Sequence, residues 1–522
     1  MERTISNGIS LGGHYPRTDE MFKGTIKFYR FYSKALSDED VAWNRVIDEA
    51  RYFGRTAAIP VTNVVVASNI PVVSGVEPVG RYAVDGSHVF TAPASKVVKG
   101  RNYTLNGYTI ETWDGSAWSA AVQHAGETSY TATDSALVRL TWQWTPGDGL
   151  IAYDADDYVQ DGLVLHYDGI RNAGLSLAHD SSATTWVNLG TAGAAYDMTR
   201  YSLVSGAMVS GDATGSWTGD GFAFAKNAFF YESELLTVQP CYTLQTVIEA
   251  TANDQNGVGY VMAPSKNYNS NDPLRFSIGL RNTSFDYGDA TLAYSFYHNA
   301  LDTTGGRPAV PVSLDEKVKY GTAMLDRTDG VFFTGTTPPW DATGASNGHA
   351  AKSSGTSSAR TYGGLTLGGN YNYTTDMFAG TIHDFRFYDR VLSDDEIAWN
   401  RLVDEARYFT ELNVVVASTR ADVQANEPDG DYRVVGSYTF TAPESVTVGK
   451  ITYAPAGYAI QQWDDAAGCW GAATEYPGVS YAYTTAAGKV RLLWRWKAVG
   501  GIRTAADYDV SDYVAGGLTF HL

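Results

Sequence analysis

Histidine and cysteine are the residue types in this 522-residue chain that could support nucleophilic or metal chemistry. The two cysteines, Cys241 and Cys469, fall in different kinds of segment, so neither a disulfide framework nor a metal-knuckle spacing can be built from them. We expect both to be small buried hydrophobic side chains. Of nine histidines, only His166 and His521 recur in matching contexts, on a segment that should form a strand. A hydrogen-bonded structural histidine is favoured there over a catalytic one.

Two sequence motifs of common catalysts do not occur. The chain contains no H-E-x-x-H, and it has no phosphate-cradling glycine loop. A pair of glycosidase carboxylates cannot be recognised from spacing, because such groups meet in space from distant strands. We therefore expect no catalytic residue, no bound cofactor and no enzymatic activity.

Four tryptophans, Trp113, Trp118, Trp142 and Trp144, could act as stacking platforms for sugar rings. Trp142 and Trp144 alternate along one strand and share one of its faces, with Arg139 on the other, so packing in a core is favoured.

The formal net charge of −19 argues against nucleic acid and anionic membranes as partners. No run of residues approaches the roughly 18 to 20 apolar positions that a membrane span needs. Neutral glycans, neighbouring repeats or other copies of the same protein fit this charge better.

An internal repeat determines how the chain is organised. Two segments that read SLGGHY…DEARYF and TLGGNY…DEARYF end at Phe53 and Phe409 (409 − 53 = 356), and NVVVAS begins at Asn63 and again at Asn413 (413 − 63 = 350). The motif DYV begins at Asp157 and returns at Asp512 (512 − 157 = 355). Offsets that vary this little indicate two copies of one period, with insertions confined to loops.

The repeat predicts five segments. A large domain would occupy 160–409, with its C-terminal part also at 1–54 and its first strand also at 515–522, and a small domain would occupy 62–157 and 412–514. We expect the sequence to be a stretch of a longer array, with any export signal or anchor outside it.

The end of the large domain has the clearest local signals. In TIHDFRFY the aromatic residues alternate, which places Phe385 and Phe387 on one face of a strand. The following segment has a capping box, Ser393 with Glu396, which predicts the start of a helix. The earlier copy has Ser37 and Asp40 at these positions. The face expected to dock on the sandwich recurs in both copies, as Trp43, Val46, Ile47, Ala50 and Phe53 and as Trp399, Leu402, Val403, Ala406 and Phe409.

The segments GLVLHYDGI, YTLQTVIEAT, LTLGGN and GTIHDFRFYDRVLSDDEI resemble the laminin-G/concanavalin-A-like lectin superfamily of bacterial surface proteins. The resemblance implies a jelly-roll β-sandwich that binds glycans at its rim or calcium through aspartates. Candidate calcium ligands are Asp168, Asp180 and Asp384, but Phe28 stands in place of Asp384 in the earlier copy, and a structural turn is favoured over a metal site.

Short β-rich runs broken by Gly, Pro, Asp and Asn predict an immunoglobulin-like sandwich for the small domain. The expected fold class is therefore all-β, with concanavalin-A-like sandwiches alternating with small immunoglobulin-like sandwiches and one short helix closing each large domain.

Two functions remain open. The first is a non-catalytic structural repeat of a very long extracellular or cell-surface protein or fibre of a bacterium. The alternative is a glycan-binding adhesin or carbohydrate-binding module, whose candidate contacts lie in polar loops at Asn267, Asn269, Asn271 and Trp340.

Overall fold

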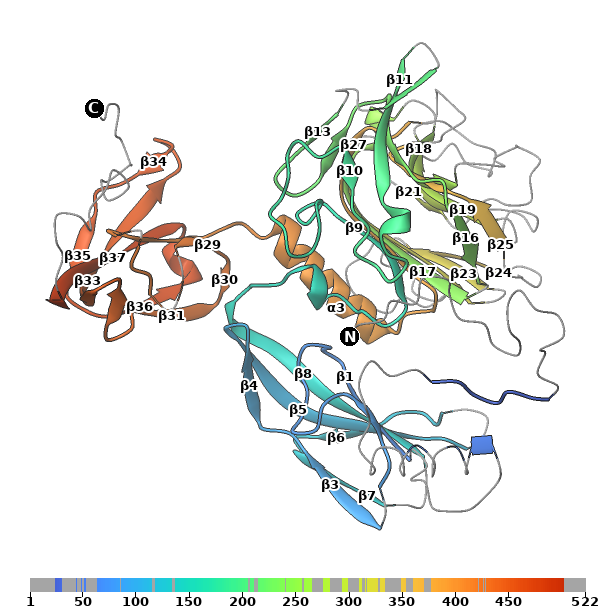
Figure 1. The fold of residues 1–522 in the computed structure, drawn as a ribbon, viewed down its shortest axis with the longest axis horizontal. Coiled ribbons are helices and arrows are strands. Elements are labelled where there is room, and N and C mark those ends of the chain that lie inside the picture. The colour runs from blue at the N-terminus through green and yellow to red at the C-terminus, as the bar shows by residue number, and fades with distance from the viewer. Residues whose placement is uncertain are drawn as a thin grey trace, which may run out of the picture.

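The structure is a computed structural model of the 522-residue chain. Before residue 63 it describes 24–30, 44, 48, 51 and 52, and from there it describes 63–501 with gaps. The gaps longer than two residues are 115–117, 134–136, 211–214, 265–275, 282–292, 299–308, 312–314, 334–348, 354–359 and 370–376. Most of the expected domain at 1–54 and all of the strand at 515–522 lie outside the described residues. The described part is all-β apart from short helices, as predicted (Figure 1).

The first small sandwich, residues 63–150, packs a main sheet against a two-stranded sheet formed by β3 and β7. The main sheet has the order β2-β1-β8-β5-β4, with β6 beside β5, and β1 runs parallel to β8. The strands are β1 Val64–Ser68, β2 Gly80–Tyr82, β3 Ser87–Thr91, β4 Ser95–Val98, β5 Arg101–Thr112, β6 Val122–Ala125, β7 Ser129–Thr133 and β8 Val138–Leu150.

Alternation along β1 and β8 explains the core of this sandwich. Val64 and Val66 point inward from β1, and Trp142 and Trp144, only 1% and 2% exposed, point inward from β8. The prediction that these two tryptophans pack in a core is confirmed.

The second small sandwich, residues 413–501, repeats this topology with the order β29-β28-β37-β33-β32 and with β31 and β36 as its second sheet. Its strands are β28 Val414–Ser418, β29 Gly430–Tyr432, β30 Val434–Val435, β31 Ser437–Thr441, β32 Val446–Val448, β33 Ile451–Asp464, β34 Cys469–Trp470, β35 Thr474–Tyr476, β36 Ser480–Thr484 and β37 Val490–Gly501.

The large sandwich, residues 158–409, stacks a nine-stranded sheet on an eight-stranded sheet. One sheet has the order β10-β11-β15-β26-β18-β19-β20-β21, with β12 beside β11, and the other has β13-β14-β27-β17-β22-β23-β24, with β9 beside β27. The strands are β9 Leu163–Asp168, β10 Thr185–Trp186, β11 Met198–Val204, β12 Ala207–Ser210, β13 Ser216–Trp217, β14 Phe222–Phe224, β15 Ala228–Tyr231, β16 Leu235–Val238, β17 Cys241–Ala250, β18 Val258–Pro264, β19 Phe276–Arg281, β20 Ala293–His298, β21 Ala309–Pro311, β22 Val318–Asp326, β23 Asp329–Phe333, β24 His349–Ser353, β25 Arg360–Gly363, β26 Leu365–Leu367 and β27 Gly380–Tyr388.

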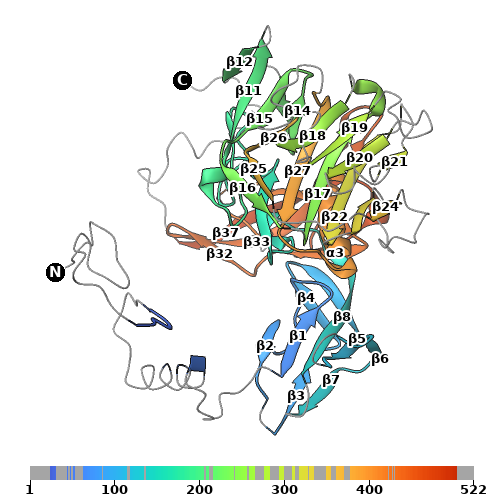
Figure 2. The same ribbon diagram turned by 90° about the vertical axis from the view of Figure 1, so that its right-hand side faces the viewer.

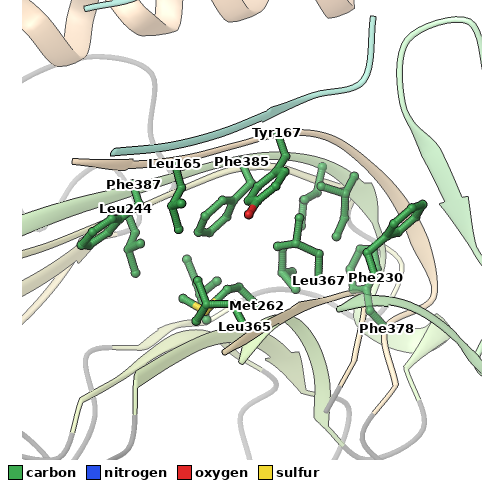
Figure 3. Packing of buried hydrophobic residues seen from close by; sticks show 14 of the residues in the cluster. Leu165, Tyr167, Phe230, Leu244, Met262, Leu365, Leu367, Phe378, Phe385 and Phe387 are labelled. Carbon is green, nitrogen blue, oxygen red and sulfur yellow. The ribbon is translucent and has the colours of Figure 1, made fainter. Parts of the chain in front are cut away.

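The core between these two sheets is strongly aromatic. Phe385 and Phe387 of β27 lie beside Leu165 and Tyr167 of the paired strand β9 and face the opposite sheet (Figure 3). The predicted inward face of the closing strand is therefore confirmed.

Helix α3, Asp394–Asp404, covers the outer face of the β9–β27 sheet and continues as a π-helical turn, Glu405–Phe409. The predicted capping box is present, with the Ser393 hydroxyl accepting from the Glu396 amide at 3.3 Å and the Glu396 carboxylate accepting from the Ser393 amide at 2.8 Å. On the predicted docking face, Trp399, Val403 and Ala406 are buried, whereas Leu402 and Phe409 are half-buried.

Candidate functional site

A cluster of buried charged side chains lies between α3 and the outer face of the β9–β27 pair. The register places Asp384 opposite Asp168 and Arg386 opposite His166, because alternate residues of both strands point away from the aromatic core. These four side chains are 0–1% exposed. Two carboxylates would therefore face each other in an interior that disfavours charge.

Two arginines, Arg407 of the π-helical turn and Arg386 of β27, pair with buried carboxylates of this cluster. The Arg407 guanidinium donates to the Asp168 carboxylate, and Arg386 forms a bidentate pair with Asp404 of α3 at 2.8 and 2.9 Å. His166 Nε2 lies 2.9 Å from Asp384 Oδ2. Burial raises the pKa of Asp168, but the charge and hydrogen bond of Arg407 outweigh it and lower this pKa to about 2.

The same cluster contains one set of possible metal ligands among the described residues. Single ligand atoms of His166, Asp168 and Asp384 lie within 4.8 Å of one another. However, Arg407 already donates to Asp168 Oδ2, and the Tyr408 hydroxyl lies 3.2 Å from that oxygen and 3.3 Å from Asp384 Oδ2. A cation at this place would meet the Arg407 charge and compete for occupied oxygens, so the donor set does not fit calcium.

The third candidate ligand, Asp180, lies apart from this cluster in an exposed turn. Its Oδ1 accepts from the Ser182 amide at 2.8 Å and from the Ser182 hydroxyl at 2.6 Å. These bonds cap a turn, which is the role that the sequence favoured.

Glu232, which follows β15, is a perturbed group that sequence reasoning missed. It is 4% exposed, and among the described residues its Oε1 has no hydrogen-bond partner. Burial raises the pKa of Glu232 to about 7. A short polar segment after an aromatic strand carries no signal that such a carboxyl is buried.

Half-buried tryptophan pairs recur at the same place in both small sandwiches. The ring centroids of Trp113 and Trp118 are 5.4 Å apart, and those of Trp463 and Trp470 are 5.1 Å apart. In each pair the second indole lies under an arginine of the neighbouring strand, with Arg139 4.2 Å from Trp118 and Arg491 4.5 Å from Trp470. Of the four tryptophans singled out in the sequence, Trp113 and Trp118 are half-buried, whereas Trp142 and Trp144 are buried.

Helix α3 joins the large sandwich to the first small sandwich. It lies between the two in both views (Figures 1 and 2). The buried side chains of the small sandwich form one continuous cluster with Ile397, Trp399 and Val403 of the helix. The Trp399 indole stacks edge-on against Tyr153 and donates to the Asp157 carbonyl at 2.6 Å.

Polar contacts lie beside and across the same joint. Within the large sandwich, the buried Asn400 side chain of α3 accepts from the Val159 amide at 3.0 Å and donates to Gln245 at 2.7 Å. Lys99 donates to both oxygens of Asp157, at 2.7 and 2.6 Å. Among the described residues other than glycine, Lys99 alone has a left-handed φ, 48°, and the second small sandwich has a glycine here, Gly449 (449 − 350 = 99). A left-handed φ is unfavourable for lysine. Lys99 adopts it at the position from which its ammonium group reaches Asp157 at the joint.

A second joint connects the two small sandwiches directly. The end of β8 pairs antiparallel with β30 of the second small sandwich, with Leu150 opposite Val434 and Gly149 opposite Val435. The Ile151 amide donates to the Arg433 carbonyl at 2.8 Å. Leu150 is 9% exposed and belongs to the core of the second small sandwich.

Arg386–Asp404 has a counterpart in the earlier copy. Arg30 and Asp48 form an ion pair, and Arg30 Nη1 lies 3.4 Å from Asn44 Oδ1 (386 − 356 = 30; 404 − 356 = 48; 400 − 356 = 44). The equivalent of Asp384 is Phe28, so the arginine–aspartate pair is shared and the extra carboxylate is not. The proposed glycan contacts at Asn267, Asn269, Asn271 and Trp340 lie outside the described residues.

No family model matches the chain, and no curated protein matches its sequence. Among solved structures, the chain is similar to the CBM40 domain of the Ruminococcus gnavus IT-sialidase, with 15% identity over 31% of this chain and 82% of that one and a TM-score of 0.23. Domain 4 of an extracellular arabinanase from Geobacillus stearothermophilus matches with 14% identity over 46% and 98%, at 0.28.

Trypanosoma rangeli sialidase matches with 12% identity over 62% of this chain and 46% of its own, at a TM-score of 0.30. Scores and identities this low carry no argument about family, ligand or activity. The resemblance to the laminin-G/concanavalin-A-like lectins therefore stays a prediction. Among the helices of the described part, none is long and apolar enough to cross a membrane.

Proposed function

We propose that this chain is a non-catalytic structural segment of a long extracellular array, in which large and small sandwiches are docked rigidly onto one another. The observation that carries the proposal is the hydrophobic core shared by the first small sandwich and α3. Independent domains on flexible linkers do not share a core. Here Asp157, at the joint, is 3% exposed, its carboxylate accepts from Lys99 of the small sandwich, and its carbonyl accepts from Trp399 of α3.

Rigid docking can be measured as distances between spin labels. Labels at Val122, Leu235 and Val479, which are 57%, 66% and 46% exposed, report on the first small, the large and the second small sandwich. The prediction that both cysteines are buried is wrong, because Cys241 is half-buried and Cys469 is exposed. Both are therefore replaced first, so that only the new cysteines react. We expect each pair of labels to give one narrow distance distribution.

A pair of labels within one sandwich, at Val97 and Val122, supplies the width expected for a rigid body. Distributions between sandwiches several times broader than this reference would show freely moving domains and would reject the structural array.

A second candidate function is binding of neutral glycans at the tryptophan pairs, Trp113–Trp118 and Trp463–Trp470. The specific observation is that a half-buried pair with an arginine over the second indole recurs in both small sandwiches. Half-buried indoles beside a polar group are suited to stacking on sugar rings.

Glycan arrays probed with the wild-type chain and with the double variant Trp118→Ala, Trp470→Ala test this candidate. Binding that the double variant loses would support it, and a blank array with the wild-type chain would remove it. A variant at the buried Trp142 is unsuitable as a control because it would disturb the core.

A further inference from the structure

The joint between the two small sandwiches consists of two halves, and each half has a counterpart in the other small sandwich. The inserting half is the end of β8, Asp148–Leu150, and we call it the exit strand. The accepting half is Arg433–Ser437, and we call it the receiving edge. In the joint, the Ser437 amide and hydroxyl donate to Asp148 Oδ2 at 3.1 and 2.9 Å.

The receiving edge recurs in the first small sandwich. There, the Asn63 side chain accepts from the Val84 amide at 2.7 Å and donates to the Val84 carbonyl at 2.9 Å. Asn413 makes the same two bonds to Val434, at 2.9 and 2.8 Å. Val84 and Val434 therefore hold equivalent places, and Gly86 and Ser87 match Gly436 and Ser437 (436 − 350 = 86; 437 − 350 = 87).

The exit strand recurs in the second small sandwich. Gly149 lies opposite Arg101 in the β5–β8 ladder, and Gly501 lies opposite Ile451 in the matching β33–β37 ladder. Both glycines have a left-handed φ, 137° and 102°, which a side chain would disfavour. The same backbone shape is therefore built at both exit strands.

The two halves that meet in the joint differ from their counterparts in how closely other residues surround them. Gly149 is buried and Gly501 is exposed, although they hold the same place. A Cβ at Gly436 would overlap the Asp148 carboxylate, whereas a Cβ at Gly86 would meet nothing within 4 Å. The chain thus presents a complementary edge on each of its small sandwiches.

We propose that the exit strand of the second small sandwich, Gly500–Gly501, pairs with the receiving edge of the first small sandwich, marked by Val84, Gly86 and Ser87, of a second copy of this repeat. The register is that of Gly149 opposite Val435 in the joint already formed. Because the two surfaces differ, the contact is head-to-tail, so each copy can bind one neighbour through each of its two small sandwiches. The inference rests on the proposed array and adds the contact that propagates it.

Cross-linking of the full chain tests this pairing. In a background with Cys241→Ala and Cys469→Ser, the variant with Ser87→Cys and Gly500→Cys places thiols where Ser437 and Asp148 meet in the joint. At a chain concentration on the order of 1 mM, a short thiol-to-thiol cross-linker should produce a ladder of dimers, trimers and longer species. Each single-cysteine variant should stop at dimers.

The variant with Asp148→Cys and Ser437→Cys is the internal control, because these residues already touch. It should cross-link within one chain, without a ladder. If this control locks and the test variant gives no ladder, the pairing between copies is wrong and the docked array stands. If the control does not lock, the array itself is wrong.

A gain-of-contact variant gives an independent result. The second exit strand has Gly500 where the first has Asp148 (500 − 352 = 148), and open space surrounds the Cβ position of Gly500. Gly500→Asp should raise the association constant on the order of tenfold or more, because it supplies a carboxylate that can accept from Ser87 as Asp148 accepts from Ser437. Gly219→Asp, at another exposed glycine with open space, adds the same charge and should leave association unchanged. Equal behaviour of the two variants in sedimentation would overturn the assignment.

Discussion

Asp168 depends on Arg407 for its charge, because both side chains are buried and the pKa of Asp168 falls to about 2. Asp168→Asn would remove the buried carboxylate that pairs with Arg407 and leave this guanidinium with the more distant Asp154, 3.6 Å away. We expect a loss of about 3–5 kcal/mol in the free energy of unfolding, measured with denaturant at pH 7. Asp180→Asn, in an exposed turn, should change it by no more than about 0.5 kcal/mol.

The Asp168–Arg407 pair also predicts how the difference in free energy of unfolding between Asp168→Asn and the wild type depends on pH. The folded pKa of Asp168 is lowered, so its contribution to stability is present above the unfolded pKa, about 3.9, and is lost as the pH falls toward 2. The two proteins should therefore approach equal stability over this range. A difference that is constant from pH 7 to pH 2 would contradict the ion pair.

Glu232 should produce the opposite pH dependence. Its folded pKa, about 7, is raised, so its contribution is fully present below the unfolded pKa, about 4.3, and is lost as the pH rises to 7. Glu232→Gln should abolish this fall in stability, measured as the denaturation midpoint at several pH values. Glu444→Gln, at an exposed position, should retain the wild-type slope.

Helix α3 acts at the scale of the element, because one of its side chains bonds both to the sheet beneath it and to the segment that enters β9. Asn400→Ala would leave the Val159 amide and the Gln245 side chain without this partner, at about 1–3 kcal/mol for each buried group. Hydrogen exchange at Val159 should accelerate. Asn253→Ala, whose amide bonds Asp315 at the surface, should leave exchange at Val159 unchanged.

The elements that could be predicted are those with a local periodicity. The alternation in TIHDFRFY and the Ser393–Glu396 box gave the closing strand and its helix, because neighbours in sequence determine both patterns. The charged cluster could not be placed, because His166 and Asp168 alternate along β9 as solvent-facing residues would. One signal could have indicated the cluster. Polar residues that alternate along a strand are expected to be buried when the predicted helix must cover that face of the strand.

The joint between the small sandwiches could not be predicted for a different reason. Its contacts are mainly backbone hydrogen bonds between β8 and β30, and backbone groups carry no sequence signature. Leu150, far from Val434 in sequence, is an ordinary apolar residue at a strand end. Only the recurrence of a glycine at Gly149 and Gly501 marks the place.

At the scale of the whole molecule, Leu150 couples two sandwiches because it belongs to the first by sequence and to the core of the second by packing. Leu150→Ala should lower the calorimetric transition of the second small sandwich, with a cost of about 2–5 kcal/mol. Leu177→Ala, at a site 57% exposed, should leave every transition in place. A shift confined to the first small sandwich would show that the core is not shared.

The strand pairing between β8 and β30 has a mechanical consequence. The chain leaves the first small sandwich at Leu150 and returns beside it at Val434, so the large sandwich is held as a closed loop between two hydrogen-bonded points. In the proposed array, tension would pass from one small sandwich to the next through this pairing. The large sandwich would lie outside the path of the force, and its length or surface could change without altering the spacing of the small sandwiches.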